Sequence, residues 1–311
     1  MFTIREVKTA NGILQYRRES LTGIACRISP GRKKRHINVR EKPLYEGNGC
    51  PFCPDAVHTA TPTFDNGSRV CRGETVTFPN LYPYAEWHTV TVITRDHAVE
   101  QFTKRQLHDA FSGTIEALMR HDGYASINWN YLPTAGASMV HPHLQGLSDQ
   151  QPPYLAGRYI SAGHRYLLRH GRTYWEDLRE REGSSERFLF GDEICWSASP
   201  VPLGEREVRG LLPVSSPGET EAYLEPLADG ILRTIELYRQ LGTHAFNVAL
   251  FFDRPGSRRG FRAFCSIISR INPNDLSLCD TSFMERLYLE PIILTLPEEL
   301  ARCYREKSRV P

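Results

Sequence analysis

The sequence predicts an α+β fold built from two similar units. In residues 88–147, runs with the alternation of β-strands flank one long amphipathic segment. The same order of elements returns in residues 207–270, at an offset of about 120 residues. A chain of 311 residues is long enough for two such units with substantial cores. We therefore expect two tandem repeats, each an antiparallel sheet packed against one long helix.

The first unit opens with a strand over residues 88–97, in which valines alternate with threonines. A helix follows from a cap at Thr103 to about Arg120, because apolar residues recur there every three or four positions. Residues 124–132 and 138–147 are predicted to form the second and third strands. We assign this unit, with the segments around it, to residues 1–180.

The second unit, assigned to residues 181–311, repeats that order. It has a strand over 207–214, a turn with a capping Ser or Thr, a helix over about 219–240, and strands over 244–252 and 260–270. Residues 148–190 between the cores are interpreted as a solvated connection with one or two helices. Its charged stretch REREGSSER, residues 179–187, is predicted to be a loop.

Composition excludes several classes of protein. Lys and Arg number 38 and Asp and Glu 36, so a net charge of +2 gives no basic excess for non-specific nucleic-acid binding. No apolar run approaches the roughly 18 residues of a membrane span. The first twenty residues lack the apolar core of a signal peptide. These features indicate a cytoplasmic protein with neither nucleic acid nor membrane as a partner.

Only two of the eight cysteines, Cys50 and Cys53, lie close together in the sequence. In a reducing compartment a C-x-x-C pair is half of a metal site or a redox pair more often than a disulfide, and two unliganded thiols remain an alternative. Two thiolates at this spacing can share one tetrahedral ion, and two further ligands must come from elsewhere. His97 and His141 are the best placed, at strand ends flanking the same helix. These four residues predict one structural Zn²⁺ site.

The run His141-Pro142-His143-Leu144-Gln145 carries a second signal. On a strand, residues i, i+2 and i+4 share a face, so both imidazoles and the amide project together. Both histidines could bind metal, or one could be anchored while the other stays free as a nucleophile or base. The small residues 136–138, ending in Ser138, would let the backbone approach a bound anion closely.

The sequence resembles the histidine-triad (HIT) superfamily, because five of its motifs occur in the order found in that family. The resemblance is specifically to the galactose-1-phosphate uridylyltransferase-like branch of two-repeat nucleotidyl transferases. The resemblance covers roughly residues 20–150. In order, the matching segments are Ser29-Pro30-Gly31-Arg32-Lys33-Lys34-Arg35, Cys50-Pro51-Phe52-Cys53, Phe78-Pro79-Asn80-Leu81-Tyr82-Pro83, Asn130 eleven residues before His141, and His141-Pro142-His143-Leu144-Gln145.

The resemblance implies a ping-pong mechanism. His143 would attack the α-phosphorus of a nucleoside-diphosphate sugar and form a covalent nucleotidyl-histidine, which a sugar 1-phosphate then accepts. The other site roles that the resemblance implies are Gln145 and Ser138 at the phosphate, Arg32 and Arg35 neutralising its charge, Asn80 at the ribose or base, Asn130 orienting the loop or the nucleophile, and Cys50, Cys53, His97 and His141 at the metal. The family also implies a homodimer.

Two departures from the family pattern concern the substrate. Residues 137–140 read Ala-Ser-Met-Val where the galactose enzymes usually carry Cys-Ser before a proline. The second unit has Arg262-Ala263-Phe264 where they commonly carry an H-x-H that serves a second metal site and hexose binding. The acceptor is therefore open between a sugar 1-phosphate, inorganic phosphate and water. Nucleotide-sugar or dinucleoside-polyphosphate phosphorylases, hydrolases of the same fold, and a catalytically silent zinc-containing nucleotide-binding protein remain as alternatives.

Overall fold

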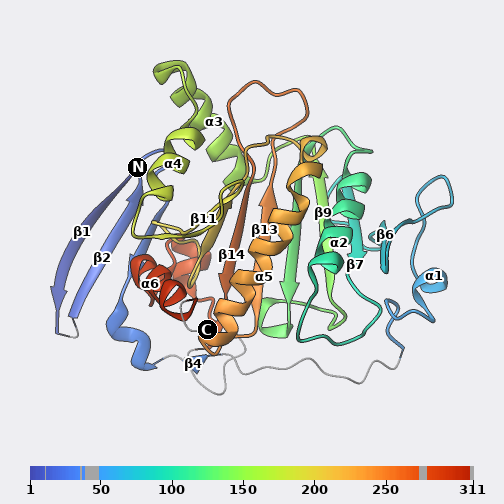
Figure 1. The fold of residues 1–311 in the computed structure, drawn as a ribbon, viewed down its shortest axis with the longest axis horizontal. Helices are drawn as coiled ribbons and strands as arrows, with labels where there is room; N and C mark the ends of the chain where they lie inside the picture. Colours follow the sequence, from blue (N-terminus) through green and yellow to red (C-terminus); the bar gives the residue numbers. More distant parts are fainter. Residues whose placement is uncertain (11, 36, 39–48, 273–278, 309–311) are drawn as a thin grey trace.

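One ten-stranded sheet forms the centre of the protein (Figure 1). The structure is a computed structural model that describes residues 1–10, 12–35, 37–38, 49–272 and 279–308. The strand order across the sheet is β10-β11-β12-β14-β13-β8-β9-β7-β6-β5, and every neighbouring pair is antiparallel. A separate four-stranded sheet, β1-β2-β3-β16, and the short pair β15-β4 lie at its margins.

The strands have the following bounds: β1 Phe2–Thr9, β2 Gly12–Glu19, β3 Ala25–Ile28, β4 Ile37–Asn38, β5 Val70–Arg72, β6 Thr75–Pro79, β7 Trp87–Val92, β8 Tyr124–Tyr131, β9 His143–Asp149, β10 Phe188–Phe190, β11 Cys195–Ala198, β12 Val208–Leu211, β13 Phe246–Phe251, β14 Phe264–Ser269, β15 Ile271–Asn272 and β16 Ile292–Ile293. The α-helices are α1 Val57–Ala60, α2 Lys104–Leu118, α3 Tyr154–His170, α4 Tyr174–Gly183, α5 Leu224–Gln240 and α6 Pro297–Lys307.

The two predicted units meet at the middle of the sheet. In the first, β7, α2, β8 and β9 follow one another, and in the second β12, α5, β13 and β14 do the same. Strands β8 and β13 pair over six residues, from Phe246 opposite Tyr131 to Phe251 opposite Ser126. The α+β class and the antiparallel strands packed with long helices are thus confirmed, but the strands form one continuous sheet where two were expected. The tandem repeat and the boundary at residue 180 stay predictions.

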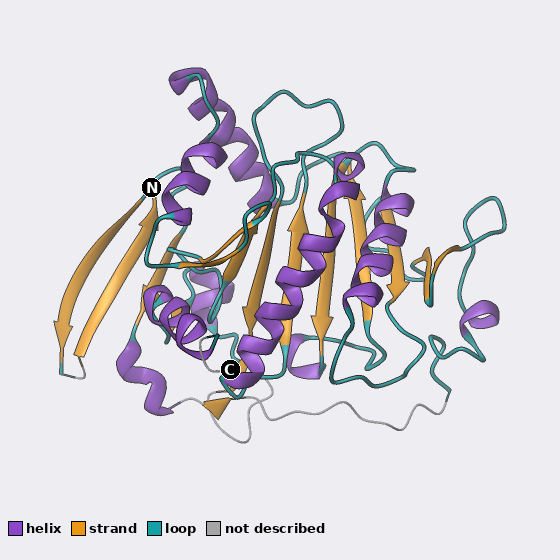
Figure 2. Ribbon diagram, in the orientation of Figure 1, coloured by secondary structure: helices purple, strands orange, loops and turns teal. Residues whose placement is uncertain are grey.

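Helices α2 and α5 cover one face of this sheet, and both cross it obliquely in Figures 1 and 2. Thr103 caps α2 as predicted, because its hydroxyl accepts the backbone N–H of Gln106 while the Gln106 side chain accepts the N–H of Thr103. The largest core cluster lies beneath the two helices and draws on both units, with Phe111 of α2, Trp129 of β8 and Phe246 of β13 among its members.

The other face is divided between a second core and the predicted site. Helices α3 and α4 pack there against strands of the second unit, burying Tyr159 and Trp175 against Phe264. The remaining part of that face belongs to β7, β8 and β9. None of the helices in the described ranges is long and apolar enough to cross a membrane.

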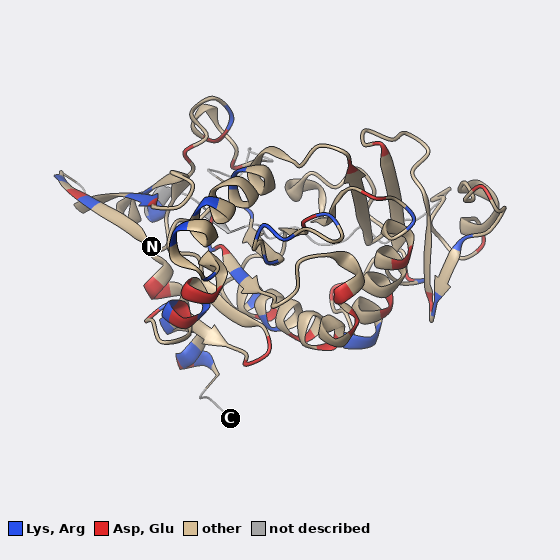
Figure 3. Cartoon of the chain, turned by 90° about the horizontal axis from the view of Figure 1, so that it is seen from above, with Lys and Arg blue, Asp and Glu red and all other residues tan. Residues whose placement is uncertain are grey.

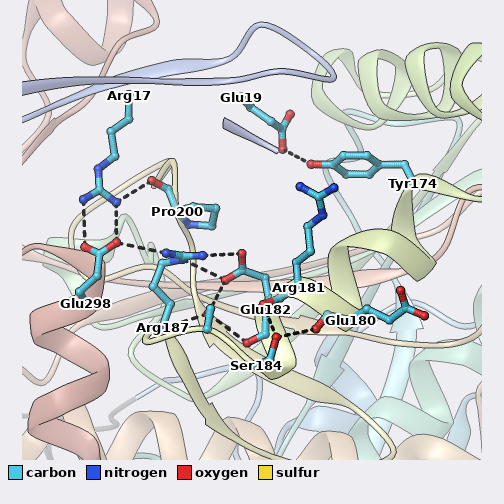
Figure 4. A network of polar contacts seen from close by, with 11 residues as sticks. Arg17, Glu19, Tyr174, Glu180, Arg181, Glu182, Ser184, Arg187, Pro200 and Glu298 are labelled. Atoms are coloured by element: carbon cyan, nitrogen blue, oxygen red, sulfur yellow. Dashed lines mark hydrogen bonds and ion pairs between the residues drawn. The ribbon is translucent and has the colours of Figure 1, made fainter. Parts of the chain in front are cut away.

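The prediction of a loop over residues 179–187 is wrong for its first half, which forms the last turn of α4. Glu182 is only 2% exposed and binds Arg187 with both carboxylate oxygens, at 2.8 and 3.0 Å (Figure 4). Arg187 also reaches Glu298 of α6, which in turn pairs with the buried Arg17. Charged residues that suggest a solvent-exposed loop in the sequence therefore form ion pairs that connect α4, α6 and β2 in the structure.

Candidate active site

Strand β9 carries two of the three predicted catalytic residues, His143 and Gln145, on the sheet face away from α2 and α5. Leu144 points into the core beneath those helices, so its neighbours His143 and Gln145 point to the opposite face. The register with β7 sets Val92 opposite His143 and Val90 opposite Gln145. The alternation inferred from the sequence therefore puts the imidazole and the amide on one surface.

The four predicted metal ligands form a compact cluster. Their ligand atoms all lie within 4.8 Å of one another. The Sγ of Cys53 is 3.5 Å from Nδ1 of His97 and 3.7 Å from Nδ1 of His141, and the Sγ of Cys50 is 3.8 Å from the latter atom. Zinc bonds of about 2.0–2.3 Å in a tetrahedron separate the ligand atoms by roughly 3.3–3.8 Å. The set therefore fits Zn²⁺, and it is the single group of three or more His, Cys, Asp or Glu in the described ranges suited to a metal ion.

Local hydrogen bonding prepares His141 as a ligand. Its Nε2 lies 2.8 Å from the carbonyl oxygen of Thr94, which can only accept, so the proton is on Nε2 and Nδ1 presents its lone pair to the cluster. Burial lowers the pKa of His141 and keeps the ring neutral. Burial and the neighbouring Cys50 thiol raise the pKa of Cys53 to about 11, so a cation is needed to hold the Cys53 sulfur as a thiolate.

His143 has the opposite tautomer. Its Nδ1 lies 2.9 Å from the carbonyl oxygen of His141 and must donate to it, which leaves the Nε2 lone pair free. Burial lowers the pKa of His143, so the ring is neutral near pH 7. Phe52 of the C-x-x-C turn packs edge-on against His143 with ring centroids 5.4 Å apart. The four-ligand cluster thus lies next to both the strand that carries His143 and the aromatic ring that packs against it.

Two donors orient the amide of Gln145. The hydroxyl of Tyr84 donates to its Oε1 at 2.6 Å, and Nε2 of His88 lies 3.0 Å from the same oxygen. The backbone N–H of Tyr84 donates to Nδ1 of His88, which places the His88 proton on Nε2. With Oε1 occupied in this way, the NH₂ group of Gln145 remains to donate to an anion.

A cavity of about 430 Å³ opens in front of these residues. Its lining includes His143, Gln145, Asn80 and Ser138, four of the predicted site residues. Asn80 is held at its edge, since its Oδ1 accepts the backbone N–H of Tyr82. This volume suits one nucleotide-sized ligand.

Asn130 is not among the residues that line this cavity, but on β8 it occupies the sheet face that His143 and Gln145 occupy on β9. The β8–β9 register ends at Trp129 opposite Leu144, and one further step would bring Asn130 opposite His143. Its Oδ1 accepts from Nδ2 of Asn247 at 2.7 Å, and that Nδ2 also donates to the carbonyl oxygen of Ala135. Arg270 in turn donates to Oδ1 of Asn247 at 2.9 Å. The second unit therefore braces the loop that leads to Ser138.

The two predicted arginines are not placed with this group. Arg32 lines a different cavity, with Arg270 and Asp280, and its 3₁₀-helix lies at the opposite end of the molecule from α1 in Figure 1. The side chain of Arg35 is outside the described part of the structure. Of the predicted site residues, Asn80, Ser138, His143 and Gln145 therefore share one cavity without the arginines, and the arginine contacts stay a prediction.

Sequence reasoning missed Tyr84, His88 and Phe52 as site residues. Phe52 lies inside the recognised C-x-x-C motif, so its position between two cysteines could have suggested it. Tyr84 and His88 belong to a segment with no motif of its own, and they reach Gln145 only through the pairing of β7 with β9.

Comparisons with known proteins agree with this architecture. An ADP-glucose phosphorylase from Arabidopsis thaliana with bound ADP-glucose superposes with a TM-score of 0.73 at 17% identity, over 94% of this chain and 99% of that one. A galT-like protein from the same plant gives 0.73 at 16% identity, over 94% and 98%. A uridylyltransferase gives 0.71 at 19% identity, over 95% and 99%.

The chain has the fold of these uridylyltransferase-like proteins. The resemblance inferred from five sequence motifs is thus confirmed at the level of the fold. An uncharacterized protein of Archaeoglobus fulgidus is 29% identical over 273 residues, which span 83% of this chain and 81% of that one. No family model matches the chain. Within this uridylyltransferase-like fold, the reaction must be inferred from the residues of the His143 cavity.

Proposed function

We propose that the protein is a nucleotidyl transferase that works through a covalent nucleotidyl-His143. The observation that carries the proposal is the free Nε2 of a neutral imidazole, fixed by the His141 carbonyl and facing a nucleotide-sized cavity. Such a preorganised nucleophile needs no deprotonation before it attacks phosphorus.

In the first half-reaction, Nε2 of His143 forms a bond to the α-phosphorus of a nucleoside-diphosphate sugar. The bond from that phosphorus to the bridging oxygen breaks, and a sugar 1-phosphate leaves with the electron pair. Gln145 donates to a non-bridging oxygen as negative charge grows there, and Ser138 lies at the same anion. In the second half-reaction a phosphate oxygen of the acceptor attacks the same phosphorus and breaks the N–P bond.

Zinc held by Cys50, Cys53, His97 and His141 would serve the scaffold. It fixes the C-x-x-C turn to the strand end that carries the nucleophile, and no reacting atom needs to touch it. Asn80 and the aromatic residues around it would hold the nucleoside.

A phosphorylase variant of this reaction has a specific observation in its favour. The likeness to the ADP-glucose phosphorylase is as strong as that to the uridylyltransferases, and residues 262–264 carry no histidine where the galactose enzymes have two. In that variant the acceptor is inorganic phosphate, and the chemistry at His143 is unchanged.

Labelling tests the covalent step and the acceptor together. The protein is incubated with UDP-glucose or ADP-glucose labelled at the α-phosphate, and acid-labile, base-stable label is counted on the isolated chain. We expect label on the wild type, none on His143→Ala, and full label on the control His108→Ala, whose half-buried ring lies on α2 behind the sheet. Equal label on His143→Ala, or none with any donor, would overturn the proposal.

The labelled protein then identifies the acceptor. Discharge by a hexose 1-phosphate indicates a transferase, discharge by orthophosphate a phosphorylase, and discharge in buffer alone a hydrolase. A homodimer and a cytoplasmic location stay predictions, of which sedimentation would check the first.

A further inference from the structure

A second concave surface lies far along the sheet from His143, between α3, α4 and the turn after β2. Two hollows of about 350 and 470 Å³ meet there and share Leu21, Ala162 and Arg165 in their linings. We name this joined surface the α3 groove. Its lining residues are all different from those of the His143 cavity, so the two are separate places on the molecule.

Positive charge surrounds the α3 groove. Arg158, Arg165 and Arg169 project from one side of α3, seven and four residues apart, and Arg181 reaches the groove from α4. All four side chains are exposed. In Figure 3, blue ribbon recurs along the helix beside the N-terminus.

These arginines have no acidic partner among the described residues. None of the four has a carboxylate oxygen within 4 Å, although most other arginines near α4 do. Two carboxylates near the groove are already engaged: Asp177 binds Arg172 at 2.9 Å and accepts from Tyr166, and Glu19 accepts from the hydroxyls of Thr22, Tyr159 and Tyr174. The guanidinium of Arg181 extends toward Tyr174 in Figure 4, and no contact is drawn to that guanidinium.

Two guanidinium groups also converge on one turn. A Cβ placed on Gly23 would lie 3.3 Å from Nη2 of Arg18 and 3.7 Å from Nη2 of Arg158. Arg158 is held there by the Thr22 carbonyl oxygen and the Tyr154 hydroxyl, both neutral acceptors. Cations that are brought together without a counter-charge repel each other, and an anion between them removes that repulsion.

We propose that the α3 groove binds an oligophosphate chain. Guanidinium forks bind phosphate oxygens in pairs, and Arg165 is placed to bridge two phosphates because it lines both hollows. One hollow offers Arg169 and Arg181 to the first phosphate, and the other offers Arg158 to the next. The rings of Tyr166 and His170, tilted by 34° with centroids 4.2 Å apart, form an aromatic wall beside the groove for the base of a nucleotide.

Calorimetric titration of the zinc-loaded full chain with tripolyphosphate tests the groove. We expect the double substitution Arg165→Gln/Arg169→Gln to weaken binding at least about tenfold, and the affinity of the wild type to fall as salt is raised. The matched control is Arg172→Gln, which removes an exposed arginine of the same region that already pairs with Asp177 and Glu180. It should bind as the wild type does.

A second titration, with ATP, distinguishes a nucleotide from a free phosphate chain as the ligand of the groove. Tighter binding of ATP than of tripolyphosphate that is lost in the double variant indicates a nucleotide on the Tyr166 wall, and equal binding indicates the phosphate chain alone. Labelling of His143 should be unchanged in the double variant, so failure of the groove and failure of the catalytic proposal are distinguishable. Any of three results overturns the proposal. These are unchanged affinity in the double variant, loss of binding only on His143→Ala, and tighter binding of an RNA oligonucleotide than of either phosphate compound. Circular dichroism of each variant confirms that it is folded.

Discussion

Tyr84 is 70% exposed, yet its hydroxyl makes a 2.6 Å hydrogen bond to Gln145. Substitution Tyr84→Phe removes one of the two donors that turn the Gln145 NH₂ toward the cavity. We expect kcat to fall about tenfold with little change in KM, because a hydrogen bond of about 1.4 kcal/mol in the transition state corresponds to that factor. Rapid-quench measurement of the rate of His143 labelling checks it.

Tyr82→Phe is the matched control for this substitution. Tyr82 lines the same cavity and is 80% exposed, but its contact with Asn80 is made by the backbone N–H. The control should label at the wild-type rate. Equal rates for both variants would show that the Tyr84 hydroxyl does not position Gln145.

The cysteine pair makes a prediction about metal content. Cys50→Ser removes a nearly buried thiolate from the four-ligand cluster, so zinc measured by mass spectrometry should fall from one per chain to less than half. The melting temperature should fall as well, because bound metal stabilises the folded state. Cys71→Ser, an exposed cysteine on β5 outside the cluster, should keep both values. Full zinc content in Cys50→Ser would refute the ligand set.

Site residues could be predicted from the sequence where their side chains have few alternative chemical uses. The metal ligands could be inferred because thiolates and imidazoles in this order have few alternative uses. Tyr84 and His88 could not be, since their partner Gln145 is 61 and 57 residues away and only strand pairing brings them together. The position of Arg32 in another cavity likewise depends on chain paths that no motif encodes.

At the scale of elements, α5 depends on a close approach to strand β11. Gly230 lies in the middle of α5, and a Cβ there would be 2.2 Å from atoms of the Trp196 indole. Gly230→Ala should therefore lower the free energy of unfolding by about 1–3 kcal/mol, although alanine in a helix is favoured by about 1 kcal/mol over glycine. Denaturant titration measures the change.

Gly183, the last residue of α4, provides a control of opposite sign. A Cβ there meets nothing within 4 Å, so Gly183→Ala should leave stability unchanged or raise it by up to about 0.5 kcal/mol. A stabilised Gly230→Ala would contradict the tight packing of α5 on Trp196.

The elements themselves were largely predictable from periodicity, and their ends were not. The helix predicted to start near residue 219 begins at Leu224, because Pro217–Glu219 and Glu221–Tyr223 form 3₁₀ turns first. The REREGSSER stretch was misassigned because local composition suggests exposure. Arg187, which pairs with the buried Glu182, is also held by Glu298, 111 residues farther along the chain.

At the scale of the whole molecule, the two units share one sheet and one core. The sequence predicted both sets of strands but carries no sign of how they join, since β8 and β13 look like any other buried strands. In the structure Phe246 of β13 packs against Trp129 and Tyr131 of β8, with ring centroids 5.0 and 4.8 Å apart. Separating the units would expose this core and the unpaired edges of β8 and β13.

This shared core predicts a single cooperative unfolding transition for both units. Hydrogen exchange at increasing denaturant, read by mass spectrometry, should show β9 and β14 opening at the same concentration, because neither unit keeps its hydrophobic core without the other. The hairpin of β1 and β2, whose outer strand is almost wholly exposed, should exchange earlier and provides the internal contrast. Separate transitions for β9 and β14 would mean that residues 1–180 and 181–311 are independent domains. In that case the hydrogen bonds from Asn247 to Asn130 and Ala135 would connect two independent domains. Unfolding of residues 181–311 would then remove these hydrogen bonds, and the Ser138 loop would lose their support first.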